Sequence, residues 1–139
     1  MGMRTRKYRL VTRAERLSNR TIRWALERGV APATWALLET TGRRSGRPQH
    51  TPVGNGRIGE TFWLVAAHGR QADYVRNIEQ QPAVRVKIGR QWMTGTAAIL
   101  DDDDPDARSR TLPHKLDAAL GRLMASQPLT IRIDLDTPA

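Results

Sequence analysis

The sequence contains no cysteine, which excludes disulfide bonds, thiolate metal ligands and thiol chemistry. Long apolar runs are missing as well. The longest, residues 62–67, is far shorter than the roughly 20 residues that a membrane-spanning helix needs. The first residues are rich in arginine and lack the apolar segment of a signal peptide. We therefore expect a cytoplasmic protein with neither a membrane span nor a secretory signal.

Acidic residues are scarce in the first two thirds of the chain. The formal net charge is +9; residues 1–30 carry nine Lys or Arg against two Glu, whereas residues 101–139 carry five basic and eight acidic groups. Such a surface attracts an anionic partner, which could be nucleic acid, anionic lipid, or a phosphorylated or polycarboxylate small molecule. With one Phe, two Tyr and four Trp, few aromatic rings interleave the arginines to stack on bases. We expect no nucleic-acid partner.

The whole chain, residues 1–139, fits a single domain. Residues 1–30 are predicted to form a basic arm and then a helix over residues 12–28, closed by Gly29, a common residue just past a helix end. Arginines share this helix with a moderate apolar set. Two interpretations stay open: peripheral membrane contact through the basic helix, or a covering helix whose arginines are solvated, which we favour.

Apolar and alternating runs between turn residues predict most of the remaining elements to be strands. Strands are expected at residues 34–41, 50–57, 61–67, 83–89, 91–100 and 129–135. The first three would form a meander, with a hairpin turn at Gly59 and Glu60. A short helix over residues 71–81 stops at Pro82, and another begins at Asp104 and carries an apolar stripe over residues 116–124. The pattern predicts an α+β fold with a mostly antiparallel barrel or curled sheet.

Residues 40–56, TTGRRSGRPQHTPVGNG, gather glycine, hydroxyl groups and fixed positive charge in one loop. The guanidinium groups of Arg43, Arg44 and Arg47 can bind phosphate or carboxylate with two hydrogen bonds each, and glycine lets the backbone approach such groups. The loop lacks the ending of a Walker A motif and the glycine spacing of a dinucleotide fingerprint. It indicates an anion site, with a mobile basic hairpin loop as the alternative.

Three further patterns support weaker hypotheses. Gly54 and Gly56 occupy alternate positions of a presumed strand and leave one face bare, either for a flat ring or for a crowded neighbouring strand. His68 follows the apolar strand and could donate a hydrogen bond to a developing oxyanion. No metal site is expected, because the three histidines are scattered and the acidic run at residues 101–104 lacks the pattern of a calcium loop.

Two segments together resemble the deazaflavin-dependent nitroreductase and quinone reductase family, actinobacterial proteins that use the coenzyme F420. The segments are TTGRRSGRPQHTPV, residues 40–53, and FWLVAAHGRQADYVRNIEQQPAVRVKIG, residues 62–89. The resemblance covers residues 37–100. It implies a mostly antiparallel split β-barrel related to the flavin-binding barrels, with an N-terminal helix and further helices covering the barrel.

The resemblance also implies a cofactor and residue roles. The cofactor would be F420, with FMN less favoured, and the arginine loop would hold its phosphate and oligoglutamate tail. The cofactor-binding residues carried over by motif position are Arg43, Arg44, Ser45, Gly46, Arg47, Thr51, Pro52, Ala67, His68, Gly69, Arg70, Tyr74 and Val75. His68 and Tyr74 are the candidates for catalytic duties.

The reaction that the resemblance implies is hydride transfer from reduced F420 to a small-molecule acceptor such as a quinone, nitro compound or enone. Two departures from the family pattern stand out. Gln49 follows the loop's proline where the family often has a basic residue, and residues 114–127 contain no tyrosine where nitroreductase members are tyrosine-rich. The second departure motivates an alternative, a non-catalytic member that binds coenzyme or lipid.

Overall fold

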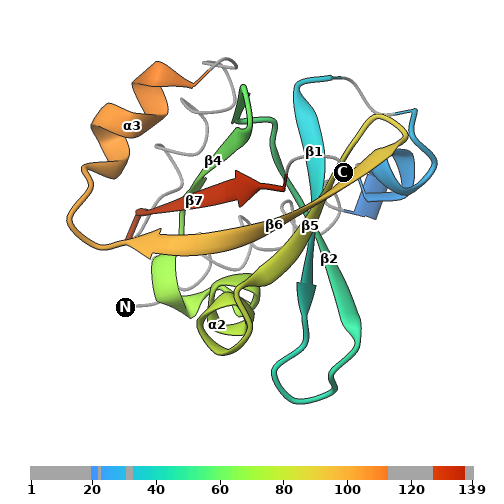
Figure 1. The fold of residues 1–139 in the computed structure, drawn as a ribbon, viewed down its shortest axis with the longest axis horizontal. Coiled ribbons are helices and arrows are strands. Elements are labelled where there is room, and N and C mark those ends of the chain that lie inside the picture. The colour runs from blue at the N-terminus through green and yellow to red at the C-terminus, as the bar shows by residue number, and fades with distance from the viewer. Residues whose placement is uncertain (1–19, 22, 31–32, 113–126, 137–139) are drawn as a thin grey trace, which may run out of the picture.

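The computed structural model describes residues 20–21, 23–30, 33–112 and 127–136. Its seven strands form one antiparallel sheet in the order β2-β1-β5-β6-β7-β4-β3, which curls into a half-open barrel (Figure 1). The strands are β1 Trp35–Thr41, β2 Pro48–Gly54, β3 Arg57–Ile58, β4 Thr61–Ala66, β5 Ala83–Ile88, β6 Gln91–Leu100 and β7 Leu129–Leu135. The predicted α+β split-barrel fold is confirmed.

The alternation of apolar and polar residues along each strand explains which face of the strand is buried in the sheet. β7 buries Leu129, Ile131, Ile133 and Leu135, and it lies between β4 and β6 with an antiparallel neighbour on each side. β5 and β6 form the expected hairpin, in which Val86 lies opposite Met93. Strands at these places were predicted from the alternation of apolar and polar residues, and their positions are confirmed within a few residues at each end.

The predicted meander of the first three strands is wrong. β2 pairs with β1, but the short β3–β4 hairpin lies at the opposite edge of the sheet, where β4 pairs with β7 over six residues. Pro48 and Pro52 suit β2 to an edge, because proline offers no backbone N–H to a further strand. The turn at Gly59, with φ of 63°, is where it was expected.

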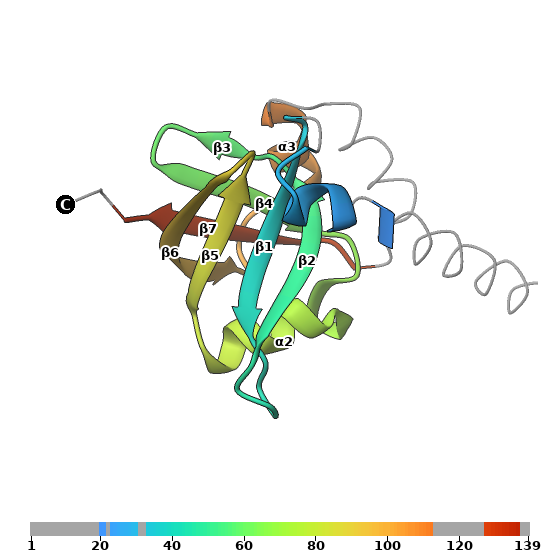
Figure 2. The same cartoon turned by 90° about the vertical axis from the view of Figure 1, so that its right-hand side faces the viewer.

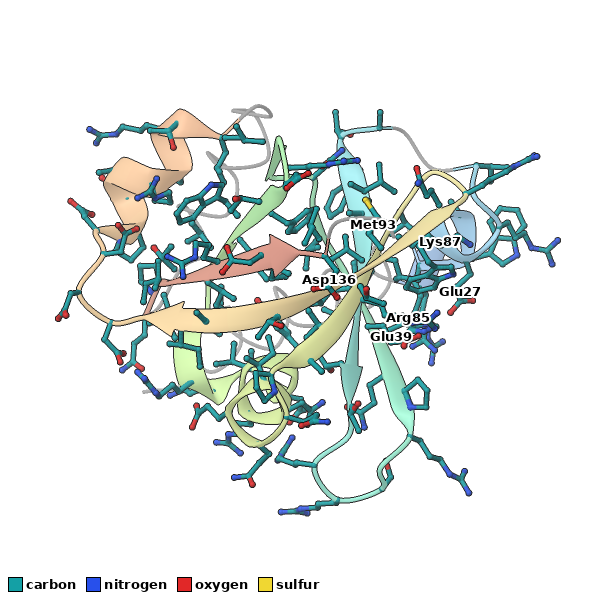
Figure 3. All side chains as sticks on the ribbon, viewed as in Figure 1. Glu27, Glu39, Arg85, Lys87, Met93 and Asp136 are labelled. Atoms are coloured by element: carbon teal, nitrogen blue, oxygen red, sulfur yellow. The ribbon has the colours of Figure 1, made fainter. Side chains whose placement is uncertain are left out.

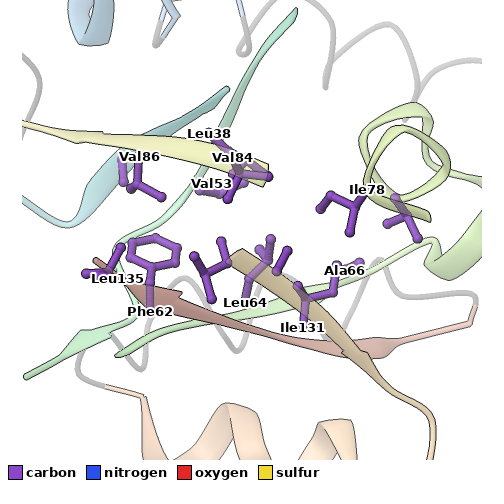
Figure 4. Close-up of a cluster of buried hydrophobic side chains, with 14 of the residues drawn as sticks. Leu38, Val53, Phe62, Leu64, Ala66, Ile78, Val84, Val86, Ile131 and Leu135 are labelled. Carbon is purple, nitrogen blue, oxygen red and sulfur yellow. The ribbon is translucent and has the colours of Figure 1, made fainter. Parts of the chain in front are cut away.

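The hydrophobic core fills the inside of the curl. Leu38, Phe62, Val86 and Ile131 are fully buried there, with side chains that meet from opposite walls (Figure 4). Helix α2, Asp73–Gln80, lies across one end of the barrel (Figure 2) and adds Val75 and Ile78 to the core. A single 3-10 turn, η1, Gly69–Gln71, leads into it. The predicted helix at residues 71–81 is thereby confirmed.

Two further helical segments lie before β1 and after β6. Residues 20–21 and 23–27 are helical, and Gly29 follows with φ of 71°, as expected of a residue that ends a helix. Helix α3, Pro105–Thr111, begins as predicted, because the Asp104 side chain accepts hydrogen bonds from the backbone N–H groups of Asp106 and Ala107. The apolar stripe expected at residues 116–124 lies outside the described residues.

A charged cluster on the outer face of the sheet joins β1, β2 and β5 (Figure 3). The Glu39 carboxylate accepts hydrogen bonds from Arg85 Nε at 2.8 Å and Nη2 at 2.7 Å, and it lies 2.9 Å from His50 Nε2. The hydrogen bonds from Arg85, more than those from His50, hold the pKa of Glu39 below its ordinary value of 4.5, although burial opposes them. This cluster therefore stabilises the fold only while Glu39 is ionised.

Replacing Glu39 by Gln is expected to lower the free energy of unfolding at pH 7 by about 2 kcal/mol, the magnitude of a hydrogen-bonded charge pair. Because the folded-state pKa is depressed, the stabilisation is present above the unfolded value near 4.5 and is lost as pH falls through the folded value. Urea unfolding between pH 3 and pH 7 measures both effects. Glu60→Gln, at an exposed turn position, is the control; equal pH slopes for Glu39→Gln and the unchanged protein would contradict this expectation.

Candidate functional site

The arginine loop, residues 42–47, connects β1 to β2 as a tight turn with its own hydrogen bonds. Gly42 N–H donates to the Arg47 carbonyl and Gly46 N–H to the Gly42 carbonyl, both at 2.8 Å. Gly46 has φ of 70°, a conformation that glycine adopts without strain. A Cβ at Gly42 would lie 2.5 Å from Ser45 Oγ and 3.2 Å from the Arg47 carbonyl oxygen, so a side chain there would require Ser45 to shift.

The loop rests on helix α2 through one buried side chain. Asn77 is 0% exposed, and its Oδ1 accepts from Arg43 N at 3.1 Å and from Arg43 Nη1 at 3.0 Å. Its Nδ2 donates to Thr40 Oγ1 at 3.1 Å and to Gln49 Oε1 at 2.8 Å. Residues before, within and after the turn are thus tied to the same amide.

The three arginines of the loop have different environments. Arg43 has 22% of its side chain exposed and forms an ion pair with Asp73, Nη2 to Oδ1 at 3.2 Å. Arg44 and Arg47 are exposed, and neither has a carboxylate partner within the part of the chain that the structure describes. Arg43 therefore belongs to the scaffold of the loop, while Arg44 and Arg47 present uncompensated charge to solvent.

A hollow of about 290 Å³ lies where the loop meets α2. Its lining consists of Arg43, Arg44, Ser45, Gln49, Asp73 and Asn77. The one acidic group, Asp73, is already matched by Arg43, so Arg44 supplies unmatched positive charge to the lining. The lining is polar and cationic, which suits a phosphate or carboxylate better than an apolar ligand.

The second group of predicted site residues leads from β4 into α2. His68 and Ala67 are half-buried, and Gly69, with φ of 55°, packs so closely on the Gln127 carbonyl that a Cβ would lie 2.4 Å from its oxygen. Arg70 is ion-paired with Asp101 at 2.7 Å and with Glu79 at 3.6 Å. None of these residues lines the described hollow.

Tyr74 and Val75 lie in the first turn of α2. Tyr74 is half-buried against the core, and burial raises the pKa of its phenol, so the hydroxyl stays protonated and able to donate a hydrogen bond. Val75 is fully buried within the core cluster, which leaves its side chain no surface to offer a ligand. Thr51 and Pro52 are half-buried on the edge strand β2. The assignment of these residues to the coenzyme stays a prediction.

Sequence reasoning missed Asn77 and Asp73, which hold the loop in place. The only signal is that Asn77 falls between Val75 and Ile78 on the buried side of an amphipathic helix, where an amide needs hydrogen-bond partners. Which partners it has depends on the long-range packing of the loop on α2, and no local pattern encodes that.

Gly54 and Gly56, which the sequence analysis placed on one strand face without side chains, have different surroundings. A Cβ at Gly56 would lie 1.9 Å from the Trp63 carbonyl oxygen, and Trp63 N–H donates to the Gly56 carbonyl at 2.9 Å. Gly56 therefore serves the crowded approach of another strand. Gly54 has open space where a Cβ would point. Only Gly54 keeps the possibility of a bare face next to a ligand.

The end of the N-terminal helix packs on the outside of the barrel. Leu26 is 2% exposed, and Lys87 Nζ donates to the Glu27 carbonyl at 2.7 Å, whereas Trp24 is 54% exposed beneath the Arg28 guanidinium. Among the described helices, none is long and apolar enough to cross a bilayer. Membrane contact through this helix stays a prediction, which cosedimentation with anionic vesicles would check.

Solved structures of similar fold identify the architecture of the chain. An F420H2-dependent reductase superposes with a TM-score of 0.56 and 19% identity, covering 74% of this chain and 94% of its own. A heme storage protein from Vibrio cholerae superposes with a TM-score of 0.56 and 14% identity, covering 84% and 92%. At such identities the likeness shows the fold, a split β-barrel.

The family follows from the sequence match. The family model of the F420H2-dependent quinone reductases matches residues 7–136. An F420H2-dependent quinone reductase of Mycobacterium tuberculosis is 30% identical over 73 residues, which cover 50% of this chain and 49% of that protein. The chain spans about half the length of the curated relatives it matches. It belongs to the F420H2-dependent quinone reductase family.

Proposed function

We propose that the protein is an oxidoreductase that uses reduced F420 to reduce an electron-poor acceptor such as a quinone, nitro compound or enone. The observation that carries the proposal is the pair Arg44 and Arg47, exposed on a loop that Arg43 and Asn77 hold in place. An elongated polyanionic coenzyme needs such fixed charge, and the family to which the chain belongs is named for that coenzyme.

The residues present suit the charged part of the coenzyme. Arg44 and Arg47 would hold the phosphate and the glutamate tail, and Ser45 and the backbone of the loop would donate further hydrogen bonds. This arrangement would orient the coenzyme by its tail.

When bound, the coenzyme would supply the hydride, and the chain's own residues would have two duties. The loop fixes the coenzyme's position, because productive transfer needs a defined approach of the two reactants. Tyr74 holds its phenolic proton, and this hydroxyl can donate a hydrogen bond to negative charge that develops on the acceptor. His68, at the end of β4, is the second candidate for that hydrogen bond.

Titration with F420 and with FMN, followed by tryptophan fluorescence, is expected to give saturable binding of F420 that is at least about tenfold tighter than that of FMN. The reason is that FMN lacks the glutamate tail that the arginines would contact. Steady-state oxidation of reduced F420 with a panel of quinones, nitro compounds and enones should then show turnover with at least one acceptor. Saturation by FMN alone would refute the assignment of F420 as the cofactor. Absence of turnover with every acceptor would refute the proposed enzymatic activity.

A second candidate function is a non-catalytic carrier of coenzyme or lipid. The absence of tyrosine from residues 114–127 favours it, and a heme storage protein has the same fold. Tight F420 binding together with no turnover on any acceptor would select this alternative.

A further inference from the structure

We infer that Asn77 is a positioning residue that fixes the arginine loop and helix α2 as one unit, so that Arg44, Arg47 and Tyr74 face the coenzyme in a set geometry. The inference deepens the proposed function and rests on it for the identity of the ligand. Asn77 itself lies beneath the loop, 0% exposed, and acts through the residues that it holds.

The side-chain amide of Asn77 donates two hydrogen bonds and accepts two, so both its nitrogen and its oxygen are fully used. Its two hydrogen-bond donations go to Thr40 at the end of β1 and Gln49 at the start of β2, and its carbonyl accepts from the backbone and side chain of Arg43. Residues before, within and after the loop therefore converge on one side chain. A backbone turn alone would leave the loop free to swing about its two ends.

This arrangement explains the Gln49 departure from the family pattern. Gln49 Oε1 accepts from Asn77 Nδ2 at 2.8 Å, so its carbonyl belongs to the anchor of the loop. A lysine or arginine at position 49 has donors only and could not accept this hydrogen bond. In this chain the positive charge for an anionic tail is left to Arg44 and Arg47.

The same helix carries Tyr74 one turn before Asn77, so the loop and the phenol share a rigid support. Arg43 adds a second link, because its guanidinium bonds both the Asp73 carboxylate and Asn77. Removing the Asn77 amide would leave Thr40, 1% exposed, and the backbone N–H of Arg43 without their partner. Buried polar groups in that state favour local opening of the loop to water.

The test compares Asn77→Ala with Asn55→Ala by hydrogen exchange of residues 42–47 in the coenzyme-free protein, and by F420 titration. Asn55 is the matched control, because its side chain also bonds backbone groups, at 2.8 Å to the Ala33 carbonyl and 3.2 Å from Arg57 N, but far from the loop. We expect Asn77→Ala to accelerate exchange in the loop about tenfold or more and to weaken F420 binding about tenfold. Asn55→Ala should change neither.

A second variant covers the case in which Asn77→Ala fails to fold. Thr40→Val removes one acceptor of the Asn77 amide while keeping the shape of a buried side chain, and it should produce the same two effects, each smaller. Unchanged loop exchange in the folded variants would overturn the inference, as would faster exchange with unaltered F420 affinity. If the unchanged protein does not bind F420, the proposed function falls, while the exchange measurement still decides whether Asn77 holds the loop.

Discussion

Replacing Arg44 and Arg47 together by alanine is expected to weaken F420 binding about 100-fold while leaving the fold intact. Each exposed guanidinium that bonds a phosphate or carboxylate contributes about 1.5 kcal/mol, and two such contributions correspond to this factor. Both side chains are exposed and have no carboxylate partner among the described residues, so no internal ion pair is broken. Isothermal titration at low and at high salt measures the effect, which should shrink as salt screens the charges.

The control for net charge is the pair Arg57→Ala and Arg90→Ala. Arg57 lies in β3 and Arg90 in the turn between β5 and β6; both are exposed, and their removal lowers the net charge by the same amount. We expect that double variant to change F420 affinity less than threefold. If both double variants lose affinity equally, the loop has no special role and general electrostatic attraction explains the binding.

Replacing Gly56 by alanine is expected to lower the free energy of unfolding by about 3 kcal/mol or more, a severe case of overpacking. The added Cβ would lie 1.9 Å from the Trp63 carbonyl oxygen, so the backbone must move where the segment between β2 and β3 approaches β4. Backbone cannot yield as the end of a flexible side chain can. Urea unfolding measures the loss, with soluble expression as a first indication.

Gly54→Ala is the matched control for Gly56→Ala. It adds the same methyl group two residues earlier, where nothing lies within 4 Å of the new atom. We expect its stability to stay within about 0.5 kcal/mol of the unchanged protein. Equal losses for the two variants would show that strand flexibility, rather than the close approach at Trp63, decides the outcome.

Local sequence patterns predicted the strands well but not their order. β5, β6 and β7 follow from the alternation of buried and exposed residues, and α3 follows from the capping side chain of Asp104. The meander failed because the choice between partners for β4 is a long-range one. Leu129–Leu135, far along the chain, has an apolar face that matches β4, whereas β2 carries two prolines that suit an edge.

The sequence indicated where the candidate site lies, but not the separate roles of its residues. Glycine, arginine and serine in residues 42–47 indicated an anion site, and the structure brings Arg43, Arg44 and Ser45 to one hollow. The sequence presents three equal arginines, and only tertiary contacts separate Arg43, held by Asp73 and Asn77, from the other two. A single buried asparagine gives almost no signal, because its role depends on what packs against it.

We predict that the arginine loop binds the anionic tail of F420. The most direct measurement compares the dissociation constants of F420 and of the same deazaflavin without phosphate and glutamates, on the unchanged protein and on the Arg44→Ala, Arg47→Ala variant. The expected result is a preference for F420 of about 100-fold in the unchanged protein, which largely disappears in the variant. Equal affinity of the unchanged protein for both ligands, or a preference that survives in the variant, would contradict the claim.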